Sequence, residues 1–153
     1  MSEKKRFLLE NGYYVSTPSG NSMRPFIKGG LDVVTVVPLE APPRLFDAVL
    51  YYRKNGEHVI HRIVCKRRDG YLIRGDNCYY TEKVSAENVI GVVHTVLRGA
   101  RTINARTDGT YRFSIAVWHI IYPVRFIVHG AVRCFVKLKR KMFGGKHKHE
   151  KNT

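Results

Sequence analysis

The stretch "DAVLYYRKNGEHVIHRIVCKRRDGYLIRGD", residues 47–76, contains three runs that are rich in Val, Ile and Tyr. Asn55-Gly56 separates the first run from the second, and Asp69-Gly70 separates the second from the third. These dipeptides suit tight hairpin turns, because such turns need positive φ angles that Asn, Asp and Gly adopt most easily. The stretch therefore predicts three consecutive antiparallel β-strands.

Strand signals continue on both sides of these hairpins. "DVVTVV" at residues 32–37 and "VIGVVHTVL" at residues 89–97 are further runs rich in β-branched residues. "PLEAPPRLF" at residues 38–46 carries three of the six prolines, which favours an extended connection over a paired strand. Because helical periodicity is absent between residues 32 and 97, we expect a mostly β domain.

The pattern changes in the last third of the chain. "RTINARTDGT", residues 101–110, is a polar stretch typical of a loop, and helical spacing of apolar residues follows from about residue 111. We therefore place a boundary near residue 108. The expected organisation is a β domain at 1–108, a basic amphipathic helical segment at 109–143 and a disordered tail at 144–153.

The helical segment has one basic face. Arg125, His129, Arg133 and Lys137 recur every four residues, and most of the remaining circumference is apolar. Such a helix can pack on the β domain, lie in a membrane interface or dock on a partner. An interfacial helix fits the pattern best, because each basic residue near anionic lipid contributes about 1 kcal/mol. An anionic membrane surface is therefore the expected partner of this face.

The overall composition narrows the function classes. The 153 residues carry 27 Lys and Arg against 12 Asp and Glu, a net charge of +15 that indicates anionic partners. Cys65, Cys78 and Cys134 are too few and too widely spaced for a disulfide framework or a zinc site. The N-terminus lacks the apolar run of a signal peptide, and no window holds 18 uninterrupted apolar residues. These features predict a cytoplasmic protein, held peripherally on the cytosolic face of a membrane by its basic helix.

Three motifs follow one another in the β region: "GNSMRP" with Ser22, "VIHRIV" with His61 and "IRGDN" with Asp76. With the surrounding strand pattern, over about residues 15–97, they resemble the signal-peptidase superfamily of serine proteases, which includes the self-cleaving SOS-type repressors. The resemblance implies a small, coiled antiparallel β fold of the signal-peptidase/LexA-like type. It also implies that the protein hydrolyses peptide bonds. The family usually has glycine directly before an aspartate with a structural role, and Asp32 matches this aspartate, although Leu31 stands between Gly30 and Asp32 in this chain.

The resemblance assigns a catalytic role to each motif. Ser22 is implied to be the nucleophile. Bacterial signal peptidases have a lysine base where this chain has His61, whereas the endoplasmic-reticulum and archaeal-like branch has histidine, so the chain is closest to that branch and His61 is implied to be the general base. Gly75-Asp76 matches a downstream pair of the same branch. Asp76 is thus the first choice for the acid that orients His61, and Glu82 is the reserve.

The oxyanion hole and the substrate contacts follow from the same comparison. The backbone N–H of Ser22 is the implied donor to the oxyanion. Signal peptidases often carry a second donor two residues before the nucleophile, but this chain has Gly20 there, which leaves Ser19 as the remaining candidate. Met23 and Pro25 are the candidates for substrate binding. No metal ion and no cofactor is expected.

The chemistry of the two residue types supports these roles independently. A serine hydroxyl needs a base within hydrogen-bonding reach whose pKa lies near the working pH, and histidine meets this requirement. A carboxylate on the far ring nitrogen would fix the tautomer and stabilise the imidazolium. Strand alternation places His61 on one face with Val59, Ile63 and Cys65, and places Ile60, Arg62 and Val64 on the other.

We therefore expect a serine endopeptidase that cleaves an extended segment of a precursor peptide or protein, as in leader- or signal-peptide processing. The substrate would add as a strand beside the site. A cytosolic leader peptide fits a chain without a signal peptide better than a secretory preprotein does. The alternative is a non-catalytic basic β module that binds nucleic acid or an anionic membrane surface. Nucleic acid is the less favoured partner. The affinity for nucleic acid would fall steeply with salt concentration and would not change in Ser22→Ala.

Overall fold

The expected hairpins form the middle of the sheet. The computed structural model describes residues 3–143, so the expected tail at 144–153 lies outside the described residues. Strands β3 (Ala48–Tyr52), β4 (His58–Arg67) and β5 (Gly70–Arg74) pair antiparallel in succession. Gly56 and Gly70 have φ angles of 91° and 148°, which explains why glycine stands at both turns.

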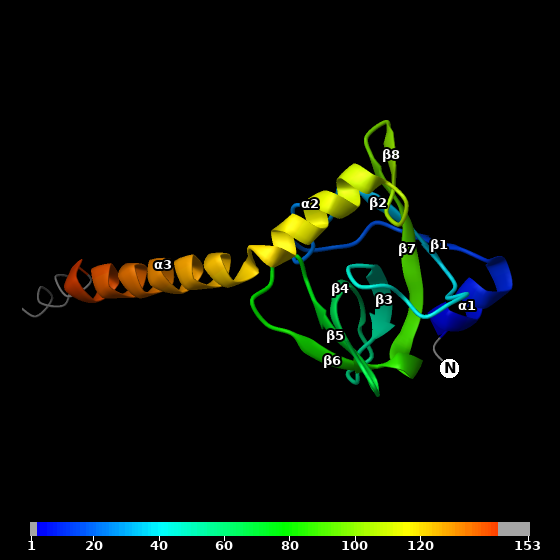
Figure 1. Cartoon of the computed structure of the whole chain (residues 1–153), viewed down its shortest axis with the longest axis horizontal. Helices are drawn as coiled ribbons and strands as arrows, with labels where there is room; N and C mark the ends of the chain where they lie inside the picture. Colours follow the sequence, from blue (N-terminus) through cyan, green and yellow to red (C-terminus); the bar gives the residue numbers. More distant parts are fainter. Residues whose placement is uncertain (1–2, 144–153) are drawn as a thin grey trace, which may run out of the picture. The chain divides into compact units, whose positions relative to one another are not determined.

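The remaining strands extend this meander into one eight-stranded sheet with the order β1-β2-β7-β3-β4-β5-β6, and β8 also pairs with β7. Figure 1 shows β7 running along the sheet between the β1–β2 side and β3. All of these pairs are antiparallel, so the prediction of a mostly β, antiparallel fold is confirmed. The strands not given above are β1 (Tyr14–Ser16), β2 (Val33–Val37), β6 (Glu82–Ser85), β7 (Val89–Arg98) and β8 (Arg101–Asn104).

The sheet buries apolar side chains in two clusters. The first contains Leu8 of α1 (Glu3–Asn11), which packs beside β1 and β7 (Figure 1). It continues through Met23 and Ile27 to the β2, β3 and β7 side chains. The second cluster joins residues of β3 to β7, namely Val49, Tyr51, Ile63, Ile73, Val84, Val89 and Val92. Two cores for one sheet mean that both faces of β3 and β4 are covered.

The alternation expected along β4 is confirmed up to Ile63. Ile63 belongs to the second cluster, whereas Ile60 belongs to the first. A β-bulge then interrupts the pattern, because Ile63 pairs with Ile73 but Cys65 already pairs with Leu72. The expectation that Cys65 shares the face of His61 is therefore wrong.

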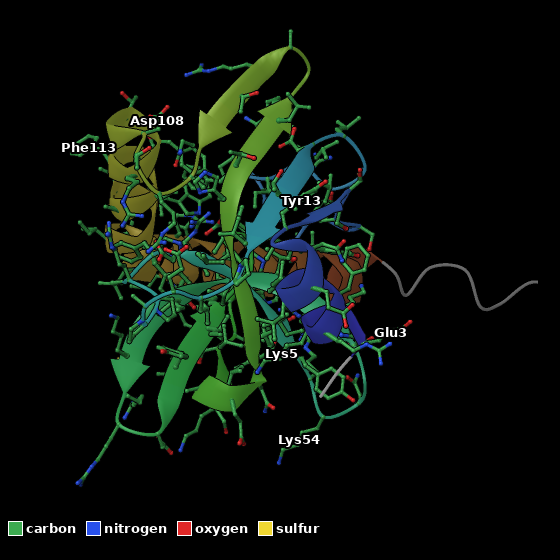
Figure 2. The ribbon with its side chains drawn as sticks, turned by 90° about the vertical axis from the view of Figure 1, so that its right-hand side faces the viewer. Glu3, Lys5, Tyr13, Lys54, Asp108 and Phe113 are labelled. Carbon is green, nitrogen blue, oxygen red and sulfur yellow. The ribbon has the colours of Figure 1, made fainter. Side chains whose placement is uncertain are left out.

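The helical part begins where the sequence indicated. Asp108 accepts a hydrogen bond from the Tyr111 N–H at 2.8 Å and so caps α2 (Gly109–Ile120). Figure 2 shows Asp108 at the start of this helix. Helix α3 (Tyr122–Phe143) follows, with Pro123 near its first turn, where the missing N–H is tolerated. One compact unit ends at His119 and the next begins at Ile120, so the division lies later than the expected boundary near residue 108.

Three elements were not expected. Helix α1, the short 3₁₀ turn at Ala86–Asn88 and strand β8 lie in stretches without a clear apolar period. Strand β8 occupies the first part of the stretch interpreted as a polar loop, and it pairs with β7 through the turn at Gly99, whose φ is 57°. The prediction of a loop throughout residues 101–110 is therefore wrong.

The structural role implied for Asp32 agrees with its contacts. Its carboxylate is 1% exposed and accepts hydrogen bonds from Arg98 at 2.7 to 3.1 Å and from the Lys28 N–H at 2.8 Å. Arg98 also donates to the Phe26 carbonyl at 2.9 Å. This pair therefore ties the end of β7 to the turn that precedes β2.

We predict that Arg98→Gln lowers the free energy of unfolding by about 2 kcal/mol, because it leaves the buried Asp32 carboxylate without its cationic partner. Arg101→Gln is the matched control, since Arg101 is exposed on the adjoining strand. Urea unfolding of both variants measures the difference. Equal midpoints for the two variants would show that the ion pair has no structural role.

Candidate active site

Ser22 lies in a turn that is bonded to the loop after β5. The Arg24 N–H donates to the Asn21 carbonyl at 3.3 Å, and the Ile27 N–H donates to the Met23 carbonyl at 2.9 Å. The Ser22 carbonyl accepts a hydrogen bond from the Asn77 N–H at 2.8 Å. This bond holds the predicted nucleophile next to the "RGDN" motif.

His61 reaches the same loop from β4. The residue is only 2% exposed. A Cβ atom on Gly75 would lie 2.6 Å from the Ser22 carbonyl oxygen and 3.1 Å from His61 Nε2. The Ser22 backbone and the imidazole thus meet around one point, and only a glycine fits there. The structure therefore brings the Ser22 backbone close to the His61 imidazole, although the two residues are far apart in the sequence.

Ser22 and His61 are not hydrogen-bonded to each other. Among the described residues, neither the Ser22 hydroxyl nor His61 Nε2 makes a hydrogen bond, and the Ser22 N–H donates to no acceptor. Catalytic hydrogen bonds are often long until substrate binds, so this arrangement is compatible with a nucleophile and its base. It also leaves the Ser22 N–H available as a donor to a ligand.

The opposite ring nitrogen of His61 faces Tyr51 and Glu82. His61 Nδ1 lies 3.2 Å from the Tyr51 hydroxyl oxygen and 3.5 Å from Glu82 Oε1. Tyr51 and Glu82 are also hydrogen-bonded to each other. Arg53 in turn donates to both carboxylate oxygens of Glu82, one of them at 2.8 Å. The reserve acid, Glu82, is therefore the carboxylate beside the imidazole.

Burial and these neighbours set the ionisation of the cluster. Burial lowers the pKa of His61, and the negative charge of Glu82 only partly opposes this effect. For Glu82, burial raises the pKa, but the hydrogen bonds from Arg53 and Tyr51 outweigh it and leave the pKa lowered. Burial and the Glu82 charge both raise the pKa of Tyr51. At neutral pH the imidazole is thus neutral, the carboxylate ionised and the phenol protonated.

Asp76, the first choice for the orienting acid, lies on the other side of β4. Its carboxylate accepts two hydrogen bonds from Arg62, both at 2.7 Å, and Oδ1 lies 2.8 Å from His119 Nε2. Its carbonyl accepts a hydrogen bond from Trp118 Nε1 at 2.7 Å. Burial raises the pKa of Asp76, but the charge and hydrogen bonds of Arg62 together with the contact to His119 outweigh this effect, so the pKa is lowered. In the structure, Asp76 therefore pairs with Arg62 and His119, and it is not the carboxylate beside the His61 ring.

Strand register explains why Glu82, and not Asp76, lies beside His61. Arg62 pairs with Arg74, and Asp76 follows two residues later on the same face. Ile63 pairs with Ile73, which pairs with Glu82, so Glu82 shares the face of His61. Neighbouring residues of β4 thus serve two separate networks, one around the imidazole and one buried between the sheet and α2.

A cleft of about 410 Å³ opens beside Ser22. Its lining includes the segment Ser16–Gly20 and, from β4, His58, Val59 and Ile60, but not His61. Met23 contributes to the cleft but is 4% exposed and belongs to the first apolar cluster. Ser19 is exposed on the wall of the cleft, as its predicted oxyanion role requires, whereas Pro25 is exposed but does not line the cleft.

Two strand edges face this cleft with free backbone groups. In the described sheet β1 pairs only with β2, so its outer edge has no strand partner. Pairing of β4 with β5 begins at Arg62, so His58–His61 have no strand partner on that side either. An extended peptide can therefore add to either edge through main-chain hydrogen bonds.

Several residues around the site were not anticipated from the sequence. Tyr51 and Arg53 support Glu82, and Cys78 Sγ lies 2.8 Å from the point where a Gly75 Cβ would be. His119 links Asp76 to Arg74, with Nδ1 at 3.0 Å from the Arg74 guanidinium. Alternation along β3 places Tyr51 on the His61 face and was the one available signal.

Among residues 3–143, no group of three His, Cys, Asp or Glu side chains is placed to hold a metal ion. The chemistry of the cluster is that of a serine, a neutral imidazole and a carboxylate. Comparison with protein-family models and with curated proteins finds no match for this chain.

We predict that Asp76→Asn lowers the free energy of unfolding by about 3 kcal/mol, because Arg62 is left as a buried and unpaired cation. Fluorescence of Trp118, the single tryptophan, reports the loss at its contact with residue 76. Asp69→Asn removes an exposed ion pair with Lys83 and should cost less than about 1 kcal/mol. If Asp76→Asn is as mild as this control, the assigned structural role is wrong.

Proposed function

We propose that the protein is a serine endopeptidase in which Ser22 is the nucleophile, His61 the general base and Glu82 the acid that orients His61. The single observation that carries this proposal is the meeting of Ser22 and the His61 imidazole at Gly75. Asp76 is not part of the proposed catalytic group. Its role is to hold the loop that contains Gly75.

The proposed reaction begins with proton transfer from Ser22 Oγ to His61 Nε2 while Oγ attacks the carbonyl carbon of the scissile peptide bond. The tetrahedral intermediate collapses, the C–N bond breaks, and His61 gives its proton to the departing amine. Water then attacks the acyl-enzyme with His61 again as base, which releases the carboxylic acid and restores Ser22. The lowered pKa of His61 supports this role, because the base is already neutral at pH 7.

The charge that develops on His61 during attack has a nearby partner. His61 Nδ1–H donates toward the Tyr51 hydroxyl oxygen and Glu82 Oε1, so the imidazolium is stabilised while its tautomer is fixed. Arg53 keeps Glu82 ionised and in place. The developing oxyanion would accept a hydrogen bond from the Ser22 N–H. Ser19, which lines the cleft, is the candidate for a second donor.

The proposed substrate is an extended segment of a precursor peptide or protein. Free backbone groups of His58–His61 and of the outer edge of β1 support binding by strand addition. The cleft is lined by Ser22 together with residues of β1 and β4, which suits an extended chain that passes the nucleophile. Leader- or signal-peptide processing is the class of reaction that combines an extended substrate with a single cleavage.

The fold resemblance is part of the same proposal. We infer a signal-peptidase/LexA-like β fold and membership of the histidine-using branch. The support is the order of the motifs around Ser22, His61 and Gly75, together with the contact between them. Under this proposal the protein acts in the cytoplasm on leader peptides of small precursors.

The proposal predicts that the purified chain cleaves members of a mixed peptide library at defined bonds. Ser22→Ala and His61→Ala should each lower the rate by at least about 10³-fold while the circular dichroism spectrum stays unchanged. Ser114→Ala and His94→Ala are matched controls, because both residues are exposed and neither lines the cleft. Cleavage that persists in folded Ser22→Ala protein would exclude the proposed nucleophile.

Glu82→Gln tests the assignment of the orienting acid through the pH dependence. Burial lowers the pKa of His61, so the acidic limb of kcat/KM against pH should have its midpoint below 6.5. The Glu82 charge raises this pKa, so its removal should shift the midpoint further down and lower kcat by at least about 100-fold. An upward shift, or an unchanged kcat, would contradict the role of Glu82.

A further inference from the structure

The two C-terminal helices expose an unusual amount of apolar surface. On α2, Phe113 and Ile120 are each 71% exposed, and Figure 2 shows Phe113 on the outer side of this helix, away from the sheet. On α3 the exposed apolar side chains are Val124, Phe126, Ile127, Val128, Val132, Phe135 and Val136. This number of exposed apolar side chains on α3 favours a surface that a partner covers.

The basic stripe of α3 runs the length of its described side chains. Arg125, His129, Arg133 and Lys137 repeat every four residues, which keeps them within about one third of the helix circumference at 100° per residue. Ile127, Val128 and Phe135 fall on the opposite side of the helix. A helix with a cationic stripe and a broad apolar remainder is amphipathic in the way that suits a water–lipid boundary.

The charge distribution selects the partner. Residues 109–149 contain no Asp or Glu, whereas nine Lys or Arg lie in this range. A second copy of α3 would bring cations against cations, and a narrow two-helix seam would leave much of the apolar arc uncovered. An anionic lipid surface covers the apolar arc with acyl chains and meets the stripe with negative headgroups.

The composition also favours lying in the interface over crossing it. No single described helix is long and apolar enough to span a membrane, and only α2 taken together with residues 122–137 meets that criterion, as a bent pair. Charged residues at each turn of α3 would be costly in the hydrocarbon core, whereas at the interface they reach the headgroups. We propose that α3 is an in-plane anchor that binds anionic membrane surfaces.

The test measures sedimentation of the full chain with phosphatidylcholine vesicles with and without phosphatidylglycerol. We expect binding to the anionic vesicles to be at least about ten-fold tighter and to weaken with salt. A triple variant, Arg125→Glu with Arg133→Glu and Lys137→Glu, should remove this preference. The control triple Lys66→Glu, Arg67→Glu and Arg68→Glu has the same net charge but changes exposed residues of the β4–β5 hairpin, and it should keep the preference.

The apolar contribution is tested separately. Ile127→Asp with Phe135→Asp should lower binding to both kinds of vesicle by at least about ten-fold, whereas Leu9→Asp with Leu31→Asp, at exposed positions elsewhere, should not. Equal losses in the two charge-reversed triples would assign binding to the overall charge and overturn the proposal. Unchanged vesicle binding by the double variant Ile127→Asp with Phe135→Asp would also overturn the proposal, because it is the result expected of a nucleic-acid site. A dimer that forms without lipid and that this double variant dissociates would overturn it as well. None of these outcomes depends on Ser22, so the anchor and the peptidase can fail separately.

Discussion

The absence of a side chain at Gly75 is the constraint on which the candidate site depends. The Ser22 carbonyl oxygen, His61 Nε2 and Cys78 Sγ all lie within 3.1 Å of the position that a Cβ would take there. The Asn77 N–H, two residues after Gly75, also donates a hydrogen bond to the Ser22 carbonyl and so holds the same loop against the Ser22 turn. This close approach therefore sets how near the Ser22 turn lies to the His61 imidazole, in addition to the apolar cluster that Met23 and Ile60 share.

Two polar networks on opposite faces of β4 support that contact. His61 Nδ1 lies beside Tyr51 and Glu82, and burial lowers the pKa of the imidazole while the Glu82 charge partly opposes this effect. Its neighbour Arg62 points the other way and pairs with Asp76 in a nearly water-free site that also receives His119 and Trp118 of α2. The second network ties α2 to Asp76, the residue that follows Gly75. This division also explains why α2 belongs with the sheet as one compact unit.

The parts of the fold with strong local signals could be predicted from the sequence. The three central strands and their turns followed from β-branched runs and the Asn55-Gly56 and Asp69-Gly70 dipeptides, whereas α1 and β8 are short and lack a clear period. In the site, the order of the motifs pointed to Ser22 and His61, and the Ser22 backbone lies near the His61 imidazole at Gly75. Asp76 was preferred to Glu82 because motif order carries no information on strand faces. The pairing of Arg62 with Arg74 places Asp76 on the face of β4 opposite to His61. The bulge after Ile63 shows why the register of two strands cannot be obtained by counting residues in the sequence.

Labelling with a fluorophosphonate probe tests the central claim most directly, because the probe reacts with a serine hydroxyl only where a base and oxyanion donors activate it. The account predicts one adduct per folded chain, located at Ser22 by peptide mapping. Labelling should become much slower when His61 is replaced by alanine. Folded protein that stays unlabelled, or that carries the adduct on another residue, would contradict the account.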